Sequence, residues 1–495
     1  MLIVDILRFK RLKKMANLYV FAIGGTGSRV LRSLTMLLAA GVKCEHNIVP
    51  IIIDPDDSAA DLTRASELMK KYASIRNKLS FTDNVENRFF QTEIKQIVPN
   101  FRLPLLNIKD VEFKDYMGFD SMSEANRAFL SVLFSNDNMR SDMKVGFKGN
   151  PNIGSVVLNQ FSDSKEFIEF ANNFKQGDKI FIVSSIFGGT GASGFPLLLK
   201  TLRSNKALPM FALINDANIG ACTVLPYFGV VQDDNSAIDS STFISKAKAA
   251  LEYYNKNISG NNSIDYLYYI GDAKRTNYEN SEGGTTQSND AHWVELCAAL
   301  AILDFDGLSK PDFTVHKEYG IEQDVTEITF SQLCGKTKSK IQRPLIQLYL
   351  FYKHFVEKCF NEKEYLKQPW GKDNGYQESF FASDFVESLQ NFFLNKQNLE
   401  EKERNYSFRR WLEEITSNDR KFKPFILEGD DPIQSVEGIA VKYGFLGSKG
   451  YSLITGILND KAKDIKAREN SQEQKLLDLY FSTTAKVVEE KMNIH

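Results

Sequence analysis

Apolar runs of strand length alternate with stretches of helical periodicity from residue 18 to about residue 330. A run of mostly apolar residues bounded by glycine, proline or polar residues predicts a strand, and apolar residues that recur every three or four positions predict a helix. The predicted strands are LYVFAI, IVPIIID, KIFIVSSI, MFALIN, VLPYFGVV and DYLYYIGD. The predicted helices are SRVLRSLTMLLAA, DSKEFIEFANNF, PLLLKTLRS, STFISKAKAALEYYNKN and AHWVELCAALAILDF. This alternation predicts an α/β fold with a parallel sheet and helices on both of its faces.

The pattern changes after about residue 330, where long Phe-rich stretches have a helical period. The stretches SQLCGKTKSKIQRPLIQLYLFYKHFVEKCF and ASDFVESLQNFFLNKQNLEEKERNYSFRRWLEEITS predict a mostly helical C-terminal region. Aromatic side chains at this spacing are typical of a core, although a binding stripe is the alternative. The aromatics concerned are Phe380, Phe381, Phe385, Phe392 and Phe393.

We therefore expect an N-terminal extension at 1–17, an α/β domain at 18–305 with an insertion at about 84–148, and a second smaller domain with the helical region at 306–495. The first fourteen residues, MLIVDILRFKRLKK, place their basic residues after the apolar ones, which is the reverse of a signal peptide. A loose extension is the favoured interpretation, and a membrane-surface helix is the alternative.

Two predicted strands run directly into glycine-rich turns that open helices. Glycine allows a positive φ and close approach of a ligand to the main chain, and a helix N-terminus directs free N–H groups and a positive dipole end into the turn. Together these features predict an anion site, most often for phosphate, with a tight turn without ligand as the alternative. The first turn contributes Gly24, Gly25, Thr26, Gly27 and Ser28, and the second contributes Gly188, Gly189, Thr190, Gly191 and Ala192.

Neither turn matches the common nucleotide fingerprints in full. The chain contains no GxxxxGK[ST] sequence, which excludes a P-loop. Gly25 and Gly27 fit the first two glycines of a dinucleotide-binding fingerprint, but Val30 stands where the third belongs.

Composition narrows the function classes. The net charge of −2 argues against a general nucleic-acid binder. The five cysteines form no CxxC pair and the five histidines form no HExxH, so we expect a reducing compartment and no zinc site. No apolar run reaches the roughly 18–20 residues of a membrane-spanning helix, so we expect no transmembrane segment.

The turns and their order resemble the tubulin/FtsZ superfamily. FGGTGASG is similar to the family's signature loop G-G-G-T-G-[ST]-G, and IGGTGSR looks like its first loop. GNPNIGS, which contains Gly149 and Asn150, is similar to the third loop, and IIIDPDDSA with Asp54 occupies the place of the second. SNDAHWVELCAALAILDF resembles the central helix of the family, at about 289–305. The resemblance covers about residues 18–315.

This resemblance implies a Rossmann-like nucleotide-binding domain of tubulin/FtsZ type that binds GTP or GDP with Mg²⁺. It implies that Asn289 and Asp290 read the base, because a carboxylate can accept two hydrogen bonds from the N1–H and N2–H₂ edge of guanine. A plain helix cap is a compatible alternative, since both residue types are favoured there. Where the family has a ribose-contacting Glu this chain has Lys200, while the basic Arg203 is kept and counted among the nucleotide-binding candidates.

In the family, the loop after the central helix inserts into the site of the next subunit and positions the attacking water. Here Asp312 keeps the first acid of that loop, Lys310 replaces its Asn, and Val315 replaces its second acid. The resemblance therefore implies a cytoplasmic protein of bacterial type that self-associates as an oligomer or filament, with Asp312 and Lys310 as catalytic candidates and weak or absent hydrolysis. The C-terminal region is expected to carry a partner surface or an assembly contact.

Two other classes of function stay open. A Rossmann-type enzyme that uses NAD or FAD would employ Gly25, Gly27 and Asp54, but it leaves FGGTGASG unexplained. A scaffold that keeps the fold and has lost the nucleotide is the other alternative.

Overall fold

The computed structural model describes residues 15–56, 58–81, 85–108, 110–143, 147, 150–231, 240–273, 276–278, 289–318, 325–360, 362, 367–376, 378–394, 406–444, 447–466 and 470–495. Gly149 and the N-terminal segment 1–14, both considered above, lie outside these ranges.

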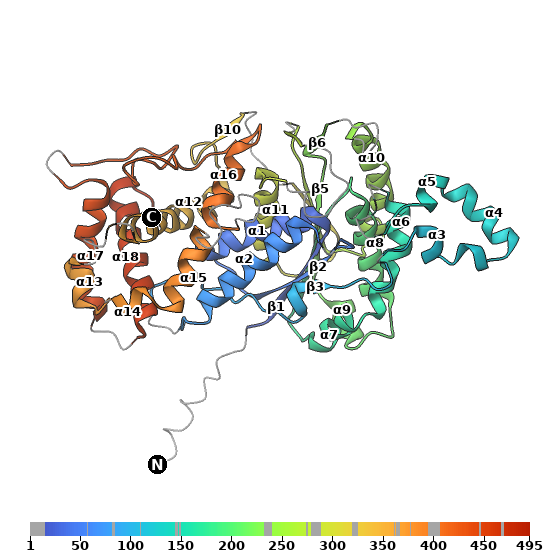
Figure 1. The fold of residues 1–495 in the computed structure, drawn as a ribbon, viewed down its shortest axis with the longest axis horizontal. Helices are drawn as coiled ribbons and strands as arrows, with labels where there is room; N and C mark the ends of the chain where they lie inside the picture. The colour runs from blue at the N-terminus through green and yellow to red at the C-terminus, as the bar shows by residue number, and fades with distance from the viewer. Residues whose placement is uncertain are drawn as a thin grey trace, which may run out of the picture.

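A seven-stranded, fully parallel sheet organises the first part of the chain (Figure 1). Its spatial order is β3-β2-β1-β4-β5-β7-β9. Because all strands run the same way, their carboxyl ends share one edge, where ligands of such folds bind. The strands are β1 (Asn17–Ile23), β2 (Asn47–Ile53), β3 (Arg102–Leu103), β4 (Lys179–Ser185), β5 (Ile219–Val224), β7 (Tyr266–Ile270) and β9 (Val315–Glu318).

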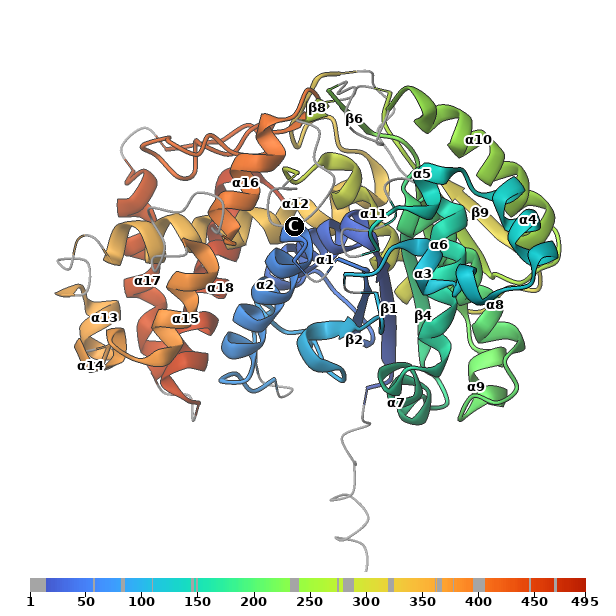
Figure 2. The ribbon, with the colours of Figure 1, turned by 45° about the vertical axis from the view of Figure 1, so that its right-hand side comes forward.

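Helices cover both faces of this sheet (Figures 1 and 2). Phe21 packs against Phe170 on one face, with ring centroids 5.0 Å apart, and Phe181 packs against Phe305 on the other at 5.2 Å. The fold is therefore α/β, as the alternating pattern predicts. The face of Phe305 carries α1 (Gly24–Ala39), α2 (Ala60–Arg76) and α11 (Trp293–Asp306), and the face of Phe170 carries α6 (Pro151–Val157), α7 (Lys165–Asn173), α8 (Gly189–Ser204) and α10 (Phe243–Tyr254).

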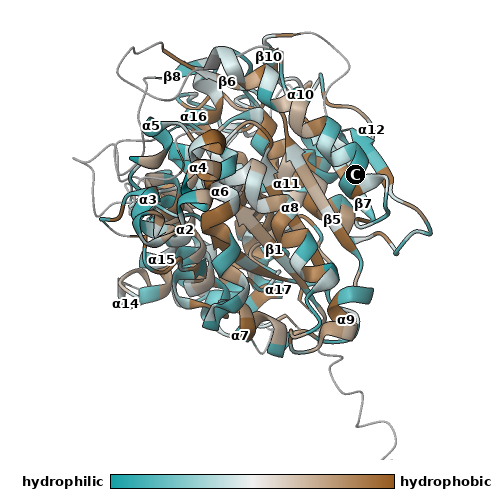
Figure 3. Ribbon diagram, turned by 90° about the vertical axis from the view of Figure 1, so that its right-hand side faces the viewer, coloured by the Kyte–Doolittle hydropathy of each residue, from teal (hydrophilic) through white to brown (hydrophobic). Residues whose placement is uncertain are grey.

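The central helix α11 lies inside the molecule. All of its residues are buried, and its apolar sequence fits a helix that is covered on every side. Its charged residues have partners: Asp304 accepts hydrogen bonds from Tyr268 at 2.8 Å and from Lys317 at 2.6 Å. The apolar colouring of the strands and inner helices in Figure 3 shows this core, with polar segments toward the outside.

One predicted strand is wrong. MFALIN forms the short helix α9 (Phe211–Asp216), and the strand beside β4 is β5, which the following residues form. Only Ile214 of α9 is buried, whereas all residues of β5 are buried, as a central parallel strand requires. VLPYFGVV supplies the end of β5 and then β6 (Phe228–Val230), which pairs with β8 (Thr276–Tyr278).

The predicted insertion at about 84–148 contributes β3 to the sheet and a projecting group of short helices (Figure 1). These are α3 (Phe113–Tyr116), α4 (Glu124–Leu133) and α5 (Asn136–Met139). None of the residues of α4, all of which the structure describes, is buried. The exposed side chains of α4 include Phe129, Val132 and Leu133.

The C-terminal region is mostly helical and packs beside α1 and α2 (Figure 1). The predicted aromatic core is confirmed: Phe380, Phe385, Phe392 and Phe393 are buried, and Phe381 packs partly buried against them. The helices are α12 (Gly335–Phe351), continued by a π-helical segment at Tyr352–Cys359, then α13 (Pro369–Asp373), α14 (Glu378–Phe381), α15 (Asp384–Phe393), α16 (Phe408–Ser417), α17 (Gly450–Lys466) and α18 (Gln472–Met492). Two short strands, β10 (Glu327–Ile328) and β11 (Lys421–Phe422), pair in parallel.

Over the ranges that the structure describes, no helix combines the length and the apolar character needed to cross a membrane.

Gly220 allows the central helix to pack closely on the sheet. A Cβ atom there would lie 2.7 Å from a ring carbon of Phe305 and 2.8 Å from one of Phe181. We expect Gly220→Ala to lower the free energy of unfolding by about 1–3 kcal/mol, because extra atoms strain a packed core. Urea denaturation measures the change.

Gly456→Ala is the control, since, apart from the adjoining backbone of α17, no described heavy atom lies within 4 Å of the Cβ that it would add. Alanine should stabilise that helix by up to about 1 kcal/mol. A Gly220→Ala variant as stable as the parent would contradict the placement of α11 against β5.

Candidate functional site

The two glycine-rich turns lie side by side at the carboxyl edge of the sheet. β1 and β4 are neighbouring strands, so α1 and α8 start next to each other. Gly24 has a positive φ of 72°, and a Cβ atom on it would lie 3.6 Å from the Cβ of Thr190. The fold therefore brings Gly24–Ser28 and Gly188–Ala192 into one place.

Neither α1 nor α8 has a side-chain cap at its N-terminus in the described ranges. Among the described residues, neither Ile23 nor Gly188, the N-cap residues of α1 and α8, accepts a hydrogen bond through a side chain, and neither first turn carries an acid. Some helices of the chain have a side-chain cap, for example α7 from Ser164 and α16 from Ser407, and others, such as α2 and α12, have none within the described part of the chain. Free N–H groups and two positive dipole ends thus converge, which favours an anion.

A buried hydroxyl adds an independent sign of a ligand. Ser28 is fully buried at the start of the second turn of α1, and its Oγ has no hydrogen-bond partner within the described part of the chain. A buried polar group without a partner is costly, but such hydroxyls also occur elsewhere in the described core, for example at Ser184 and Thr223, so Ser28 supports a ligand only through its place beside the glycine turns. Thr26 differs, because its hydroxyl accepts a hydrogen bond from Arg29 at 3.2 Å.

The glycines divide into two groups. A Cβ on Gly27 would lie 2.6 Å from the carbonyl carbon of Ala22, and one on Gly191 would lie 2.4 Å from the carbonyl oxygen of Ser185. These two glycines are needed for helix-to-strand packing whether or not a ligand binds. A Cβ on Gly24 would have its nearest atom 3.6 Å away, in ordinary van der Waals contact, whereas one on Gly25 would lie 3.3 Å from both Arg29 Nη1 and Asp61 Oδ2, so the less crowded position is Gly24.

Asn150 and Asp54 flank the two turns. The Asn150 side chain caps α6 by accepting from Asn152 at 3.0 Å, and α6 packs on the start of α8, where a Cβ on Gly154 would lie 3.0 Å from the Gly189 carbonyl oxygen. Asp54 follows β2, the other neighbour of β1, and its Oδ1 accepts from the Asp56 N–H at 3.0 Å. Burial raises the pKa of the Asp54 carboxyl to about 7.

Asn289 and Asp290 precede the central helix but do not cap it. His292 is the N-cap of α11 and forms a capping box with Glu295, so the capping alternative for the Asn-Asp pair is wrong. The Asn289 carbonyl accepts from Arg64 at 3.1 Å. Asp290 accepts from Ser417 of α16 at 3.0 Å, and burial, followed by the nearby Glu414 carboxylate, raises its pKa.

A buried cluster of charges connects these parts, and sequence reasoning missed it. Arg29 donates to Asp61, to Glu295 and, at 2.8 Å, to the Tyr227 hydroxyl. Since Arg29 also donates to Thr26, the cluster joins the first glycine turn to the central helix. The sequence signal for this cluster is a pair of arginines, Arg29 and Arg32, three positions apart on a helix that has no other charged residue.

Glu414 of α16 forms a second buried cluster. It accepts from Arg32 at 2.7 Å, from Arg64, and from the Ala291 N–H at 3.0 Å. Burial opposes ionisation of Glu414, but the charges of Arg32 and Arg64 bring its pKa below the ordinary value. Arg410 adds a third guanidinium at 3.0 Å.

The structure does not bring Arg203 to the glycine turns. It lies thirteen residues after Thr190 on α8, or about 20 Å along a helix. Its guanidinium donates to the carbonyl of Ser263 at 2.8 Å and to Asp265 at 3.0 Å, which fixes the far end of α8 to the sheet.

Lys310 and Asp312 also lie away from the turns, at the opposite edge of the sheet. Lys179, the first residue of β4, donates to the carbonyls of Asp306 and Leu308 at 2.7 and 2.8 Å, which places the following loop at the amino edge. Lys310 donates to Asp216 at 3.0 Å, and Asp312 is exposed. The seven residues of β4 separate the two edges by about 23 Å.

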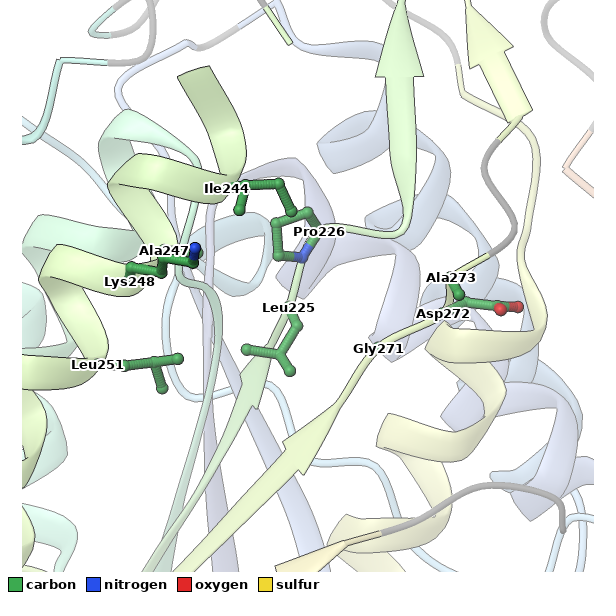
Figure 4. Close-up of a pocket in the computed structure, with 9 residues that line it drawn as sticks. All are labelled: Leu225, Pro226, Ile244, Ala247, Lys248, Leu251, Gly271, Asp272 and Ala273. Atoms are coloured by element: carbon green, nitrogen blue, oxygen red, sulfur yellow. The ribbon is translucent and has the colours of Figure 1, made fainter. Parts of the chain in front are cut away.

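A mostly apolar pocket of about 410 Å³ lies near the ends of β5 and β7 (Figure 4). Leu225, Ile244 and Leu251 face one another between α10 and the end of β5, and the Asp272 carboxylate points away from them. Asp272 is ion-paired with Arg420 at 2.5 Å. The pocket contains none of the residues predicted from the sequence.

In the part of the chain that the structure describes, no group of three or more His, Cys, Asp or Glu side chains could hold a metal ion.

A scan against protein-family models gives no match, and neither does a search of curated proteins. Among solved structures, the chain is similar to CetZ from Methanosaeta thermophila, with 17% identity over 52% of this chain and 46% of that one and a TM-score of 0.27. GDP-bound CetZ1 from Haloferax volcanii matches with 13% identity over 52% and 51% of the two chains and a TM-score of 0.26. A GTPγS-form protofilament of TubZ from Bacillus thuringiensis serovar israelensis matches with 13% identity over 59% and 55% and a TM-score of 0.27.

The chain thus spans about half the length of the solved structures it matches.

Ser28→Ala separates a ligand site from a structural turn. We expect it to raise the free energy of unfolding of the ligand-free protein by about 1 kcal/mol, because it removes a buried hydroxyl without a partner. Chemical denaturation without added ligand measures the change.

The matched control is Ser33→Ala on the same helix. Its hydroxyl accepts from the Trp411 indole N–H at 3.2 Å, so its loss should lower stability by about 1 kcal/mol. Equal destabilisation by both variants would show that Ser28 already has a partner and would remove this support for a ligand.

Proposed function

We propose that this protein binds a guanine nucleotide whose phosphates lie over the starts of α1 and α8. The observation that carries the proposal is the convergence of two helix N-termini without a side-chain cap among the described residues, at a point where a Cβ added to Gly24 would lie 3.6 Å from the Cβ of Thr190. Two such ends in one place suit a group with several negative oxygens, such as a diphosphate or triphosphate.

Backbone N–H groups of the two turns would hold the phosphates, and the hydroxyls of Ser28 and Thr190 would add donors. The residues concerned are Gly24, Gly25, Thr26, Gly27, Gly188, Gly189, Thr190, Gly191 and Ala192. Mg²⁺ keeps several waters and is usually bound together with substrate phosphates. We therefore expect it to arrive with the nucleotide.

Asp290, with Asn289 beside it, would read the base. A carboxylate matches the two donors of guanine, N1–H and N2–H₂, whereas adenine lacks that pair. The side chain of Asp290 is 33% exposed, so it is accessible to a ligand.

We propose that binding of the nucleotide leads to self-association of the protein. Lys310 and Asp312 cannot reach the nucleotide of their own chain, because they lie at the opposite edge of the sheet. They can reach a nucleotide only in a neighbouring copy stacked edge to edge, which would make hydrolysis depend on assembly. A bacterial cytoplasmic location and a partner on the C-terminal region stay predictions.

The first test compares nucleotides by thermal shift. We expect GTP and GDP to stabilise the protein by about 2.7 kcal/mol at one hundred times the Kd, and ATP and NAD to do so only at higher concentrations. Equal shifts with ATP would remove the base-reading role of Asp290, and a shift with NAD alone would favour the dinucleotide enzyme. No shift with any nucleotide would favour the empty scaffold.

The second test concerns hydrolysis. Phosphate release should be slow, because Val315 is an apolar residue that cannot orient water, and it should rise faster than linearly with protein concentration. Asp312→Ala should reduce the remaining turnover by about 100-fold or more, as loss of a general base does. Lys310→Ala tests whether the ammonium contributes once it leaves Asp216.

Glu318→Ala removes an exposed carboxylate from the other end of β9 and serves as the control. Brisk turnover that Asp312→Ala leaves unchanged would exclude this loop from catalysis.

A further inference from the structure

Helix α16 of the C-terminal region reaches the position of Asp290. Ser417 Oγ lies 3.0 Å from Asp290 Oδ2, and Arg410 Nη2 lies 3.6 Å from Oδ1. Arg410 and Asp290 are 30% and 33% exposed, so both can meet a ligand from solvent.

The Arg410 guanidinium has N–H groups that can still donate hydrogen bonds to a ligand. Its Nε donates to Glu414 at 3.0 Å. Its terminal nitrogens stand 3.6 Å from Asp290 and 3.8 Å from Glu413, which is beyond hydrogen-bond distance. A guanidinium has five N–H donors, and within the described ranges only the one on Nε makes a hydrogen bond.

The groups beside Asp290 complete the edge of guanine. That edge presents the acceptor O6 followed by the donors N1–H and N2–H₂, and it needs one donor and two acceptors in that order. A guanidinium next to a carboxylate supplies this set. Adenine presents a donor, the 6-amino group, and an acceptor, N1. Its donor would face the donor groups of Arg410, and its acceptor would face the accepting carboxylate of Asp290.

We propose that Arg410 is a specificity-determining residue of the base site, donating to guanine O6 while Asp290 accepts from N1–H and N2–H₂. This inference rests on the proposed guanine-nucleotide function and adds the C-terminal region to the recognition of the base.

The present contacts of Asp290 can be exchanged for a base at little cost. The Ser417 hydroxyl also lies 2.7 Å from the Glu414 carbonyl oxygen, so it keeps an acceptor when it releases Asp290. Glu414 stays in place through Arg32 and Arg64, and Ser407 caps α16 by accepting from the Arg410 N–H at 3.2 Å. The helix is thus held while the two side chains turn to the ligand.

The experiment measures binding of GDP, 6-thio-GDP and ADP by calorimetry to the parent and to Arg410→Ala. We expect Arg410→Ala to weaken GDP binding by about tenfold to a hundredfold, as loss of a charged hydrogen bond does, and to leave ADP unchanged. Sulfur is a weaker acceptor than oxygen, so 6-thio-GDP should bind the parent less tightly than GDP, with the difference disappearing in the variant.

Arg409→Ala is the matched control on the same helix, because Arg409 pairs with Glu357, Glu413 and Glu428. It should leave GDP affinity unchanged. Unaltered GDP affinity in Arg410→Ala, or an equal loss with 6-thio-GDP in both proteins, overturns the inference while the guanine function stands. A parent that binds no GDP, or binds ADP as tightly, overturns both. The comparison of the two ligands on the parent needs no variant, so a misfolded Arg410→Ala leaves the inference falsifiable.

Discussion

The buried carboxylate of Glu414 holds the sheet-bearing part and the C-terminal helices together. It accepts from Arg32 of α1, from Arg64 of α2 and from the Ala291 N–H just before α11. Four segments therefore meet at one side chain that has no exposed area. Removing one member of such a cluster leaves an uncompensated buried charge, which typically costs about 3–5 kcal/mol. The relative positions of the glycine turns, the central helix and α16 all depend on this contact.

The sequence predicts well those elements whose signal is local. β1 and β4 are apolar runs that end in glycines, and their turns meet because the parallel strands are neighbours. MFALIN has the composition of a strand, but it forms a helix. The strand beside β4 is β5, whose small residues include Gly220, and this glycine leaves room for the ring of Phe305. Which of the two segments joins the sheet depends on contacts with distant strands and with α11, and a local sequence pattern does not contain that information.

The glycine turns of the candidate site could be predicted from the sequence, whereas its buried ion pairs could not. Each glycine turn is a contiguous motif, so residue type and order suffice to find it. Glu414 and Arg64 are 350 positions apart, and a contact at that separation leaves no periodic trace. Asp290 was predicted as a site residue from its position before the central helix. Its neighbours Ser417 and Arg410 belong to α16, and the sequence of that region indicates only an amphipathic helix. Arg203 fits the motif by spacing alone, and the helix carries it away from the turns.

The separation between Arg32 and Glu414 also has a consequence for synthesis. The two residues are 382 positions apart, and a ribosome that adds about 5–20 residues per second needs about 20–75 seconds to join them. During that interval the sheet can assemble, but the sides of α1 and α2 that the C-terminal helices later cover are still exposed to water. Those sides carry apolar residues as well as the two arginines, so this interval is when the nascent chain most needs a chaperone.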